Sequence, residues 1–443
     1  MTETTPSIFD TFVFEPTECQ SKALFLIEEF IQKPQTESAF VLRGSAGTGK
    51  TSLMQAVVQY LKTIGVNYVL LAPTGKAVKV LSKRVADFAS TVHSQIYIPE
   101  ELKDEKIKFN FRSNESEVRT IFIVDEASML RAKNLSSEDF NTPNSILDDL
   151  IRFIKGGNSE NQVIFIGDIY QLPPVNEEES VALSATDLAK YHYISAQEAT
   201  LNKVMRQADD SSILTLANEI KFRKDTESSL NKINLERFKS ENVAISYFLE
   251  NFDKNNLENI IIIALSNKRV QELNIKVRQQ LGLANQAISA GDVVMLNRNW
   301  MSNTQRLTKG ELGIVHSTTG IIENRMGLQF TDAIIEFDGL KIETKILIDS
   351  LLSEKGDIDR EVMKGLKNDR MAKNKDYRAT EKSSDDPYMS ALHLRYGYAI
   401  TCHKAQGSEW DKVLIEPKFN LGNHRWLYTA VTRARDEVCS WWY

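Results

Sequence analysis

Eight residues near the start of the chain have the types and spacing of a phosphate-binding loop: Gly44-Ser45-Ala46-Gly47-Thr48-Gly49-Lys50-Thr51. An apolar, strand-like run precedes them at 39–42, and a helical apolar pattern follows. Small residues let successive backbone N–H groups face a phosphate, and the new helix adds its positive end. Lys50 would reach the β- and γ-phosphates, and Thr51 would hold Mg²⁺. An ordinary glycine-rich turn is the alternative, but the flanking strand and helix favour binding of a nucleoside triphosphate.

Three further polar residues stand where buried strands are predicted to end. Asp125 and Glu126 follow the apolar run 121–124, which is the Walker B arrangement. Asp125 would fix Mg²⁺ through water, and Glu126 would polarise the attacking water. A strand-end acid pair by itself is more often only solvated, but a position about 75 residues after a phosphate loop favours catalysis. Gln171 follows the next apolar run, where a polar sensor of the γ-phosphate could stand.

The bulk composition is ordinary for a soluble globular protein. The 443 residues are 42% hydrophobic and 26% charged, and the formal net charge of −6 argues against a generally basic coat while leaving room for a local basic groove. No run approaches the roughly 18 continuous apolar residues of a membrane span, and the N-terminus lacks a signal pattern. The three cysteines are far apart, without metal-ligand spacing. We therefore expect reduced thiols, a cytoplasmic location and no membrane contact.

Alternating strand and helix patterns position these residues. The first helix is predicted to begin at Thr17, whose capping-box spacing gives Gln20 a capping role; reading the adenine edge of ATP is its second possible role. The alternation up to the strand before Gln171 predicts one doubly wound parallel sheet with its ligand at the strand C-termini. A helical stretch is then expected to about Arg206.

The second half repeats the α/β pattern with an interruption. A new unit opens with the apolar run 260–265 and resumes at 398. Short strands and turns at 291–347 are typical of a small β-barrel, and 350–390 is charged and predicted to be partly helical. In the first half, a polar insertion has hairpin character, with strands at 96–98 and 107–111.

The motifs in this order resemble the superfamily 1 helicases, and more narrowly the 5′→3′ branch, superfamily 1B, of Dda- and RecD-like enzymes. Gln406 supports the branch, because the 3′→5′ enzymes typically have lysine there. The segments that carry the resemblance are spread over nearly the whole chain: GSAGTGKT, LAPTGKAVKVL, STVHS, IVDEASML, FIGDIYQLPPV, VMRQ, YAITCHKAQGSEWDKV and LYTAVTRAR.

The resemblance implies an α/β fold with two RecA-like P-loop domains, a hairpin insertion, and an SH3-like barrel plus helical insertion. The implied domains are 1A at 1–93 and 120–205, 1B at 94–119, 2A at 206–290 and 391–443, and 2B at 291–390. ATP and Mg²⁺ would bind between 1A and 2A, with Arg206 and Arg433 as transition-state cations, unless either arginine only forms a surface salt bridge. The implied nucleotide-binding residues are Gln20, Gly44, Gly47, Thr48, Gly49, Lys50, Thr51, Ser52, Gly407 and Glu409.

The implied activity is 5′→3′ movement on single-stranded DNA, with unwinding at single-strand/duplex junctions. A monomer is expected, with single-strand-binding, replication or recombination proteins as partners. Other interpretations remain open: a translocase that strips proteins or moves along RNA, or a subunit of a larger repair complex. The implied DNA-binding residues are Pro73, Thr74, His93, Phe109, Thr401, His403 and Lys404. Outside their motifs, Thr74 and Thr401 would be interpreted as strand-end caps.

Two predictions concern the hairpin. Phe109 is expected across from Pro99, where its ring would either stack on a base or pack on Ile96 and Ile98. The second involves the tip acids, Glu100, Glu101, Asp104 and Glu105. Cations at 364–378 would either brace these acids or form a solvated helix face or disordered linker.

Overall fold

The computed structural model describes residues 6–101, 107–134, 144–205, 212–222, 235–302, 305–353, 358–417 and 423–442. Two units divide the chain: the first comprises 1–102 and 106–221, and the second comprises 103–105 and 222–443. Within the described ranges, no helix combines the length and apolar character needed to cross a membrane.

The first unit is built on a six-stranded sheet with strand order β3-β2-β6-β7-β1-β8. Every neighbouring pair is parallel, so the predicted doubly wound sheet is confirmed. Parallel strands bring their carboxyl ends to one edge, where ligands bind in such folds. The strands are β1 (Ser38–Gly44), β2 (Asn67–Ala72), β3 (Ala89–Thr91), β6 (Thr120–Val124), β7 (Gln162–Gly167) and β8 (Ser195–Leu201).

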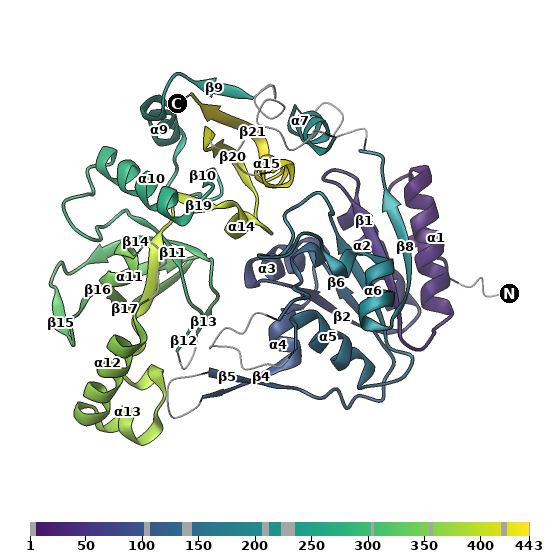
Figure 1. The fold of residues 1–443 in the computed structure, drawn as a ribbon, viewed down its shortest axis with the longest axis horizontal. Coiled ribbons are helices and arrows are strands. Elements are labelled where there is room, and N and C mark those ends of the chain that lie inside the picture. Colours follow the sequence, from purple (N-terminus) through teal and green to yellow (C-terminus); the bar gives the residue numbers. More distant parts are fainter. Residues whose placement is uncertain are drawn as a thin grey trace. The chain divides into compact units, whose positions relative to one another are not determined.

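Helices cover both faces of this sheet (Figure 1). Along β1, Phe40 and Leu42 pack with α1, α2 and α3, whereas Ala39 and Val41 pack with α4, α5 and α6, as the period of two requires. The predicted start at Thr17 is confirmed, since Thr17 is the N-cap of α1. The helices are α1 (Glu18–Gln32), α2 (Lys50–Thr63), α3 (Gly75–Val85), α4 (Val92–Ile96), α5 (Ile146–Lys155), α6 (Ala185–His192) and α7 (Ser212–Lys221), with short 3₁₀ turns η1 (Ile8–Thr11), η2 (Ala127–Met129) and η3 (Val181–Leu183).

The expected helical stretch to Arg206 is wrong. It contains only η3 and α6, after which β8 joins the edge of the sheet beside β1. The sequence of β8 is polar, and four of its seven residues are exposed, so it lacks the apolar run typical of a central strand. Arg206 itself lies outside the described residues.

A two-stranded hairpin belongs to the first unit. Its strands are β4 (Tyr97–Glu101) and β5 (Ile107–Phe111), and Pro99 pairs with Phe109 as predicted. The predicted tip acids Asp104 and Glu105 lie outside the described residues, so the brace between the tip and the cations at 364–378 stays a prediction.

The hydrogen bonds of this hairpin alternate along the ladder. Arg112 donates its backbone N–H to the Ile96 carbonyl at 2.8 Å, so Ile96 and Arg112 form a hydrogen-bonded pair. Hydrogen-bonded and non-hydrogen-bonded pairs alternate in an antiparallel ladder, and Pro99–Phe109 is three positions further along. It is therefore a non-hydrogen-bonded pair, and the backbone nitrogen of Pro99 faces away from β5.

The second unit has its own parallel sheet, with strand order β19-β10-β20-β21-β9. The return to α/β structure predicted at residue 398 is confirmed, because β19 begins one residue later. The strands are β9 (Glu236–Phe238), β10 (Ile260–Ala264), β19 (Ala399–Thr401), β20 (Trp410–Ile415) and β21 (Ala434–Trp441), and the helices are α9 (Glu241–Asn251), α10 (Asn267–Gln280), α14 (Cys402–Ala405) and α15 (His424–Val431).

A small closed barrel interrupts this unit, as predicted. Its sheet has the order β14-β11-β18-β17-β16-β15, and an additional β14–β16 pairing closes it. A buried ion pair between Arg278 Nε and Asp292 Oδ1, 2.7 Å long, joins α10 to the start of the barrel. The strands are β11 (Val293–Leu296), β14 (Leu312–Thr318), β15 (Glu323–Arg325), β16 (Leu328–Phe337), β17 (Leu340–Leu347) and β18 (Leu392–Tyr396), with a separate pair β12 (Trp300–Met301) and β13 (Arg306–Leu307).

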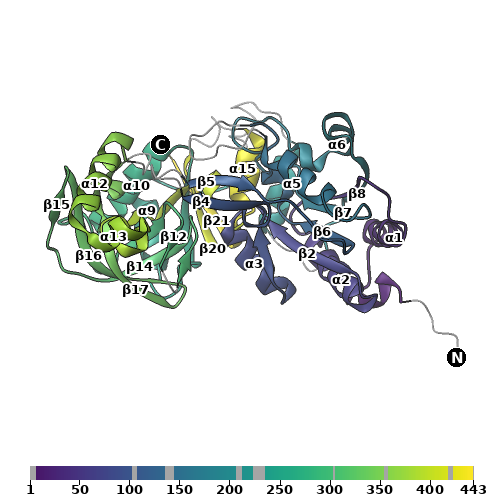
Figure 2. The same cartoon turned by 90° about the horizontal axis from the view of Figure 1, so that it is seen from below.

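The charged segment is helical in part, as predicted, and the disordered-linker alternative is wrong for residues 358–390. It contains α11 (Ile348–Leu352), α12 (Arg360–Lys373), α13 (Lys375–Thr380) and the turn η5 (Ser383–Asp385). Figure 2 shows α12 on the same side of the molecule as the barrel strands. Leu366 of α12 is buried in a cluster with residues of β16 and β17. Arg370 pairs with buried Asp386 at 2.9 Å. At least one of the predicted cations at 364–378 therefore forms an ion pair within the segment itself.

Candidate nucleotide-binding and catalytic site

The phosphate-binding loop lies between β1 and α2. Gly47 and Gly49 have φ values of 75° and 86°, in the left-handed region that favours glycine. A Cβ at Gly44 would approach Thr48 Oγ1 to 2.5 Å, so that position also has no room for a side chain. Lys50 begins α2, and its Nζ donates to the carbonyls of Gly44 (2.6 Å) and Ser45 (3.0 Å). The loop thus has the cradle and the cation that a phosphate requires. Thr51 and Ser52 follow in the first turn of α2, both half-buried.

Gln20 braces the loop from behind. Its amide oxygen accepts the Thr17 backbone N–H at 2.9 Å, which is the predicted capping role. Its Nε2 donates to the Thr48 carbonyl at 3.0 Å, and a Cβ at Gly49 would approach the same nitrogen to 2.5 Å. Both ends of this buried amide are therefore engaged, and contact with adenine would require one of these bonds to be exchanged.

The acid pair follows buried β6. Asp125 donates its backbone N–H to the Leu71 carbonyl of the neighbouring strand, which fixes its position at the sheet edge. Burial raises the pKa of Asp125, and the backbone N–H of Glu126 and the charges of Lys50 and Arg84 oppose that rise. Glu126 has a φ of 51°, a left-handed conformation that costs a non-glycine residue about 1–3 kcal/mol. Such strain is concentrated at functional sites.

Gln171 follows β7, which lies between β6 and β1 in the sheet. Within the described part of the chain, its amide oxygen Oε1 is buried and has no hydrogen-bond partner. An unsatisfied buried acceptor is costly, so this oxygen is suited to accept a hydrogen bond from a bound group such as a water. The carboxyl ends of β1, β6 and β7 thus bring together Lys50, Asp125 and Gln171.

A helix that sequence reasoning did not include packs on the same loop. A Cβ at Gly47 would approach Leu214 Cδ1 of α7 to 2.8 Å, and Met205 donates its backbone N–H to the Gly47 carbonyl at 3.1 Å. At the end of α7, Lys221 Nζ donates to Ser45 Oγ at 3.2 Å. No motif contains Lys221, and 176 residues separate it from its partner, so the sequence carried no signal for it.

Three candidate DNA-binding residues of the first unit lie at the ends of β2 and β3. Pro73 is half-buried directly after β2. Thr74 is the N-cap of α3 and accepts the Ala77 backbone N–H at 3.2 Å, which is the capping alternative. His93 lies in α4, directly after β3, where burial and the charge of Arg131 lower its pKa to about 4. At neutral pH His93 is therefore uncharged and offers a phosphate only a neutral N–H.

Phe109 continues an aromatic row from α4 onto the hairpin. The ring centroids of His93 and Tyr97 are 6.0 Å apart, and those of Tyr97 and Phe109 are 6.2 Å apart. Phe109 is half-buried against the core of the first unit rather than fully exposed. The Phe109 ring can therefore pack on the protein and stack on a DNA base at the same time, because one part of the ring is covered and another part is accessible.

In the second unit, Arg433 is buried and lies two residues after the end of α15 at Val431. Its guanidinium donates to the carbonyls of Thr429 (3.1 Å) and Ser408 (3.2 Å). The second bond holds the loop that contains Gly407, whose φ is 72°. Glu409 in that loop pairs with Arg435 at 3.7 Å.

The remaining candidate DNA-binding residues lie where β19 meets α14. Thr401 is the N-cap residue of α14 but makes no side-chain capping bond, so the capping alternative does not account for it. His403 is exposed and Lys404 is half-buried on this short helix. The three residues lie at the carboxyl end of a parallel strand, the position expected for a ligand site.

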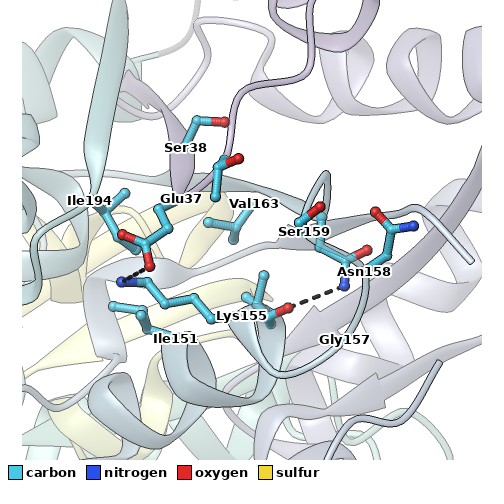
Figure 3. A pocket seen from close by; sticks show the side chains of 12 residues that line it. Glu37, Ser38, Ile151, Lys155, Gly157, Asn158, Ser159, Val163 and Ile194 are labelled. Atoms are coloured by element: carbon cyan, nitrogen blue, oxygen red, sulfur yellow. Dashed lines mark hydrogen bonds and ion pairs between the residues drawn. The ribbon is translucent and has the colours of Figure 1, made fainter. Parts of the chain in front are cut away.

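Other places in the described part of the chain could also hold small ligands. A cavity of about 110 Å³ lies at the amino-terminal ends of β1 and β7, crossed by an ion pair between Lys155 and Glu37 of 3.2 Å (Figure 3). It is at the opposite end of these strands from the phosphate loop and is not the nucleotide site. In the second unit, Glu236, Glu437 and Cys439 lie close enough to share a metal, but Glu437 already accepts from Lys412 at 3.1 Å.

Comparisons with known proteins bear on the family of the chain. Residues 26–235 match the family model of an AAA domain, and residues 396–439 match that of a UvrD-like helicase C-terminal domain. The chain is 24% identical over 416 residues to the ATP-dependent RecD2 DNA helicase of Deinococcus radiodurans, covering 90% of this chain and 46% of that protein. It is 23% identical over 453 residues to the ATP-dependent DNA helicase dda of Enterobacteria phage T4, covering 95% of this chain and 98% of that protein. The chain thus spans less than half the length of the first of these relatives.

The fold has solved counterparts. A chain from a structure of two coordinating Pif1 helicases at forked double-stranded DNA superposes with a TM-score of 0.50 and 18% identity. The superposition covers 96% of this chain and 92% of that chain. At this identity the similarity shows the fold alone, two parallel sheets and a small closed barrel.

Proposed function

We propose that this chain, which belongs to the superfamily 1B helicases, is an ATP-dependent DNA helicase that moves 5′→3′ on single-stranded DNA and unwinds duplex. The observation that carries the proposal is the convergence of Lys50, Asp125 and Gln171 at the carboxyl ends of three adjacent strands. Within the described residues, the buried amide oxygen of Gln171 has no hydrogen-bond partner and can accept one from a bound group. The similarity to the RecD2 and dda DNA helicases supports the DNA-helicase assignment.

ATP would bind in the loop cradle, with its β- and γ-phosphates facing Lys50. Thr51 and Asp125 would hold Mg²⁺, which neutralises phosphate charge when bound. Glu126 would accept the proton of the attacking water, and Gln171 Oε1 would orient that water by accepting its second hydrogen. The hydroxyl oxygen of Thr51 and the carboxylate oxygens of buried Asp125 are the kind of ligands that Mg²⁺ prefers.

Hydrolysis would also require cations that the phosphate loop does not supply. We assign this role to Arg206 and Arg433, on the proposed division into domains 1A, 1B, 2A and 2B. Arg433 belongs to the second unit, so its use as a cation would make hydrolysis depend on closure of the two RecA-like domains and would convert the ATP state into movement. Gly407 and Glu409 would lie near the nucleotide in the closed state, where Arg433 orders their loop through Ser408.

Single-stranded DNA would run over residues at the strand ends of both units. Thr74, Thr401 and Lys404 would bind phosphates, Pro73 and Phe109 would contact base faces, and the two histidines, His93 and His403, would donate imidazole N–H groups. Most of these contacts would go to the backbone, so the binding would be independent of sequence and weakened by salt. We expect a monomer that works beside single-strand-binding, replication or recombination proteins.

The test uses matched duplexes that carry either a 5′ or a 3′ single-stranded tail. Unwinding only from the 5′ tail is expected, and equal or better unwinding from the 3′ tail would show that the proposed direction is wrong. Lys50→Ala is the inactive control, because the γ-phosphate loses its main protein cation and DNA-stimulated ATPase should disappear.

We also propose a second function, because the chain matches 46% of the RecD2 protein and a related sequence therefore occurs within a longer enzyme. The chain would then be a translocase that strips proteins, or a subunit of a larger repair complex. Strong stimulation of ATPase by single-stranded DNA without unwinding would identify the translocase, and ATPase that DNA does not stimulate would identify the subunit.

A further inference from the structure

One lysine beside the phosphate loop belongs to none of the motifs. Lys221 is the last residue of α7, in the first unit, and its Nζ donates to Ser45 Oγ at 3.2 Å. Ser45 is the second residue of the loop, and its carbonyl also accepts from Lys50 at 3.0 Å. The two ammonium groups therefore contact the same loop residue from different elements.

The charges around Lys221 support a shared anion site. Its Nζ lies 5.1 Å from the centroid of the Tyr170 ring, one residue before Gln171. Burial lowers the pKa of Lys221, Lys50 lowers it further, and the Asp168 carboxylate raises it. Two cations held close to each other repel, and an anion between them removes that repulsion. A phosphate has the right charge and three acceptor oxygens for this role.

The packing of α7 fixes the position of this lysine. Buried apolar residues, Ile213, Leu216, Ala217 and Ile220, hold the helix in place. At the start of the helix, Leu214 covers Gly47, and Lys221 reaches Ser45 nearly two turns further on. The helix therefore spans the loop with an apolar contact at one end and an ammonium group at the other.

We propose that Lys221 binds the terminal phosphate of the nucleotide, so that the first unit carries two phosphate-binding lysines, Lys50 and Lys221. The proposal rests on the proposed function, because it assumes that the loop binds ATP. It makes α7 a sensor of the terminal phosphate: the ammonium contacts it in ATP and has no such partner in ADP. The competing role is a brace, in which Lys221 only ties α7 to Ser45.

The test compares nucleotide affinities of the full-length chain by titration calorimetry, using ADP and the non-hydrolysable ATP analogue AMP-PNP. Lys221→Ala should weaken AMP-PNP binding by roughly tenfold, the loss of one charge-assisted hydrogen bond, and change ADP binding by less than about twofold. Lys221→Arg should restore part of the discrimination, because it keeps the charge.

Lys190→Ala is the matched control. Lys190 is also in the last turn of a first-unit helix, and its Nζ lies 4.8 Å from the Tyr191 ring. Its ammonium group contacts this neighbouring ring. This variant should bind both nucleotides like the wild type.

The outcomes separate the two proposals. If Lys221→Ala weakens both nucleotides equally, or neither, Lys221 is not a terminal-phosphate ligand, although the proposed function stands. If the wild type binds neither nucleotide, the proposed function itself is wrong. Loss of AMP-PNP affinity alone supports the terminal-phosphate contact, provided that the melting temperature of the variant stays close to that of Lys190→Ala.

Discussion

The contact between Gly47 and Leu214 makes a quantitative prediction about the phosphate loop. Gly47→Ala introduces two separate costs. The φ of 75° is left-handed, which costs an alanine about 1–2 kcal/mol. The new Cβ would also meet Leu214 Cδ1 at 2.8 Å, and overpacking of this kind costs about 1–3 kcal/mol. The sum is a destabilisation of about 2–5 kcal/mol in the first unit.

The two costs can be separated with two further variants. Gly65 has a similar φ of 68°, but a Cβ there would meet nothing within 4 Å. Gly65→Ala should therefore show the backbone cost alone, about 1–2 kcal/mol. Leu214→Ala removes the side chain that the new Cβ strikes, so Gly47→Ala combined with Leu214→Ala should be less destabilised than the sum of the single variants by about 1–3 kcal/mol.

The assay can distinguish the two units. All five tryptophans, Trp300, Trp410, Trp426, Trp441 and Trp442, belong to the second unit. Urea unfolding followed by tryptophan fluorescence should therefore be unchanged in these variants, whereas far-UV circular dichroism should show an earlier transition of the first unit. Hydrogen exchange of α2 amides locates the effect.

Two results would refute this reasoning. Additive costs in the double variant would mean that Leu214 does not pack on the loop. An equal cost for Gly47→Ala and Gly65→Ala would mean that the backbone conformation accounts for everything and that α7 has room for a side chain.

The sites make four further predictions. Arg433→Ala should lose DNA-stimulated hydrolysis on the order of 10³-fold while retaining much of the ATP affinity, and wild-type turnover would remove Arg433 from the site. Phe109→Ala should weaken single-strand binding by about 1–3 kcal/mol and slow unwinding; a normal unwinding rate with a lowered melting temperature would instead support packing alone. The pKa of His93 is lowered to about 4 from an ordinary 6.5, so the stability that the neutral imidazole contributes is present above pH 6.5 and is lost as the pH falls toward 4. Urea unfolding should therefore show that the free energy of unfolding falls by about 2 kcal/mol between pH 7 and about pH 5. His93→Asn should abolish this pH dependence. Reversing the tip acids to lysine should slow unwinding but not single-strand-stimulated ATPase, a Lys-to-Glu reversal in 364–378 should restore part of the rate, and an unchanged rate across low and moderate salt would exclude the brace.

Local chemistry made much of the site predictable. The loop glycines, Lys50 and the acid pair each sit at the end of an apolar strand, and parallel strands bring such ends together whatever the intervening sequence. The hairpin register was also predictable, because β4 and β5 are close in sequence and pair directly.

The contacts that could not be predicted join distant segments or use generic groups. Lys221 meets Ser45 across 176 residues, and no spacing rule identifies such a pair. The family motif singles out Arg433, but no sequence pattern predicts that its guanidinium donates to the carbonyls of Thr429 and Ser408. Strand β8 lies at a sheet edge, where the burial that makes a strand recognisable is incomplete.

The position of Pro99 has a consequence for how the protein behaves at high concentration. A two-stranded ribbon has two open edges, and an open edge can recruit a strand from another molecule. Because the backbone nitrogen of Pro99 faces away from β5, the outer edge of β4 lacks one donor at the middle of its length. An incoming strand would find its ladder interrupted there. The hairpin can therefore present this edge without becoming a template for aggregation.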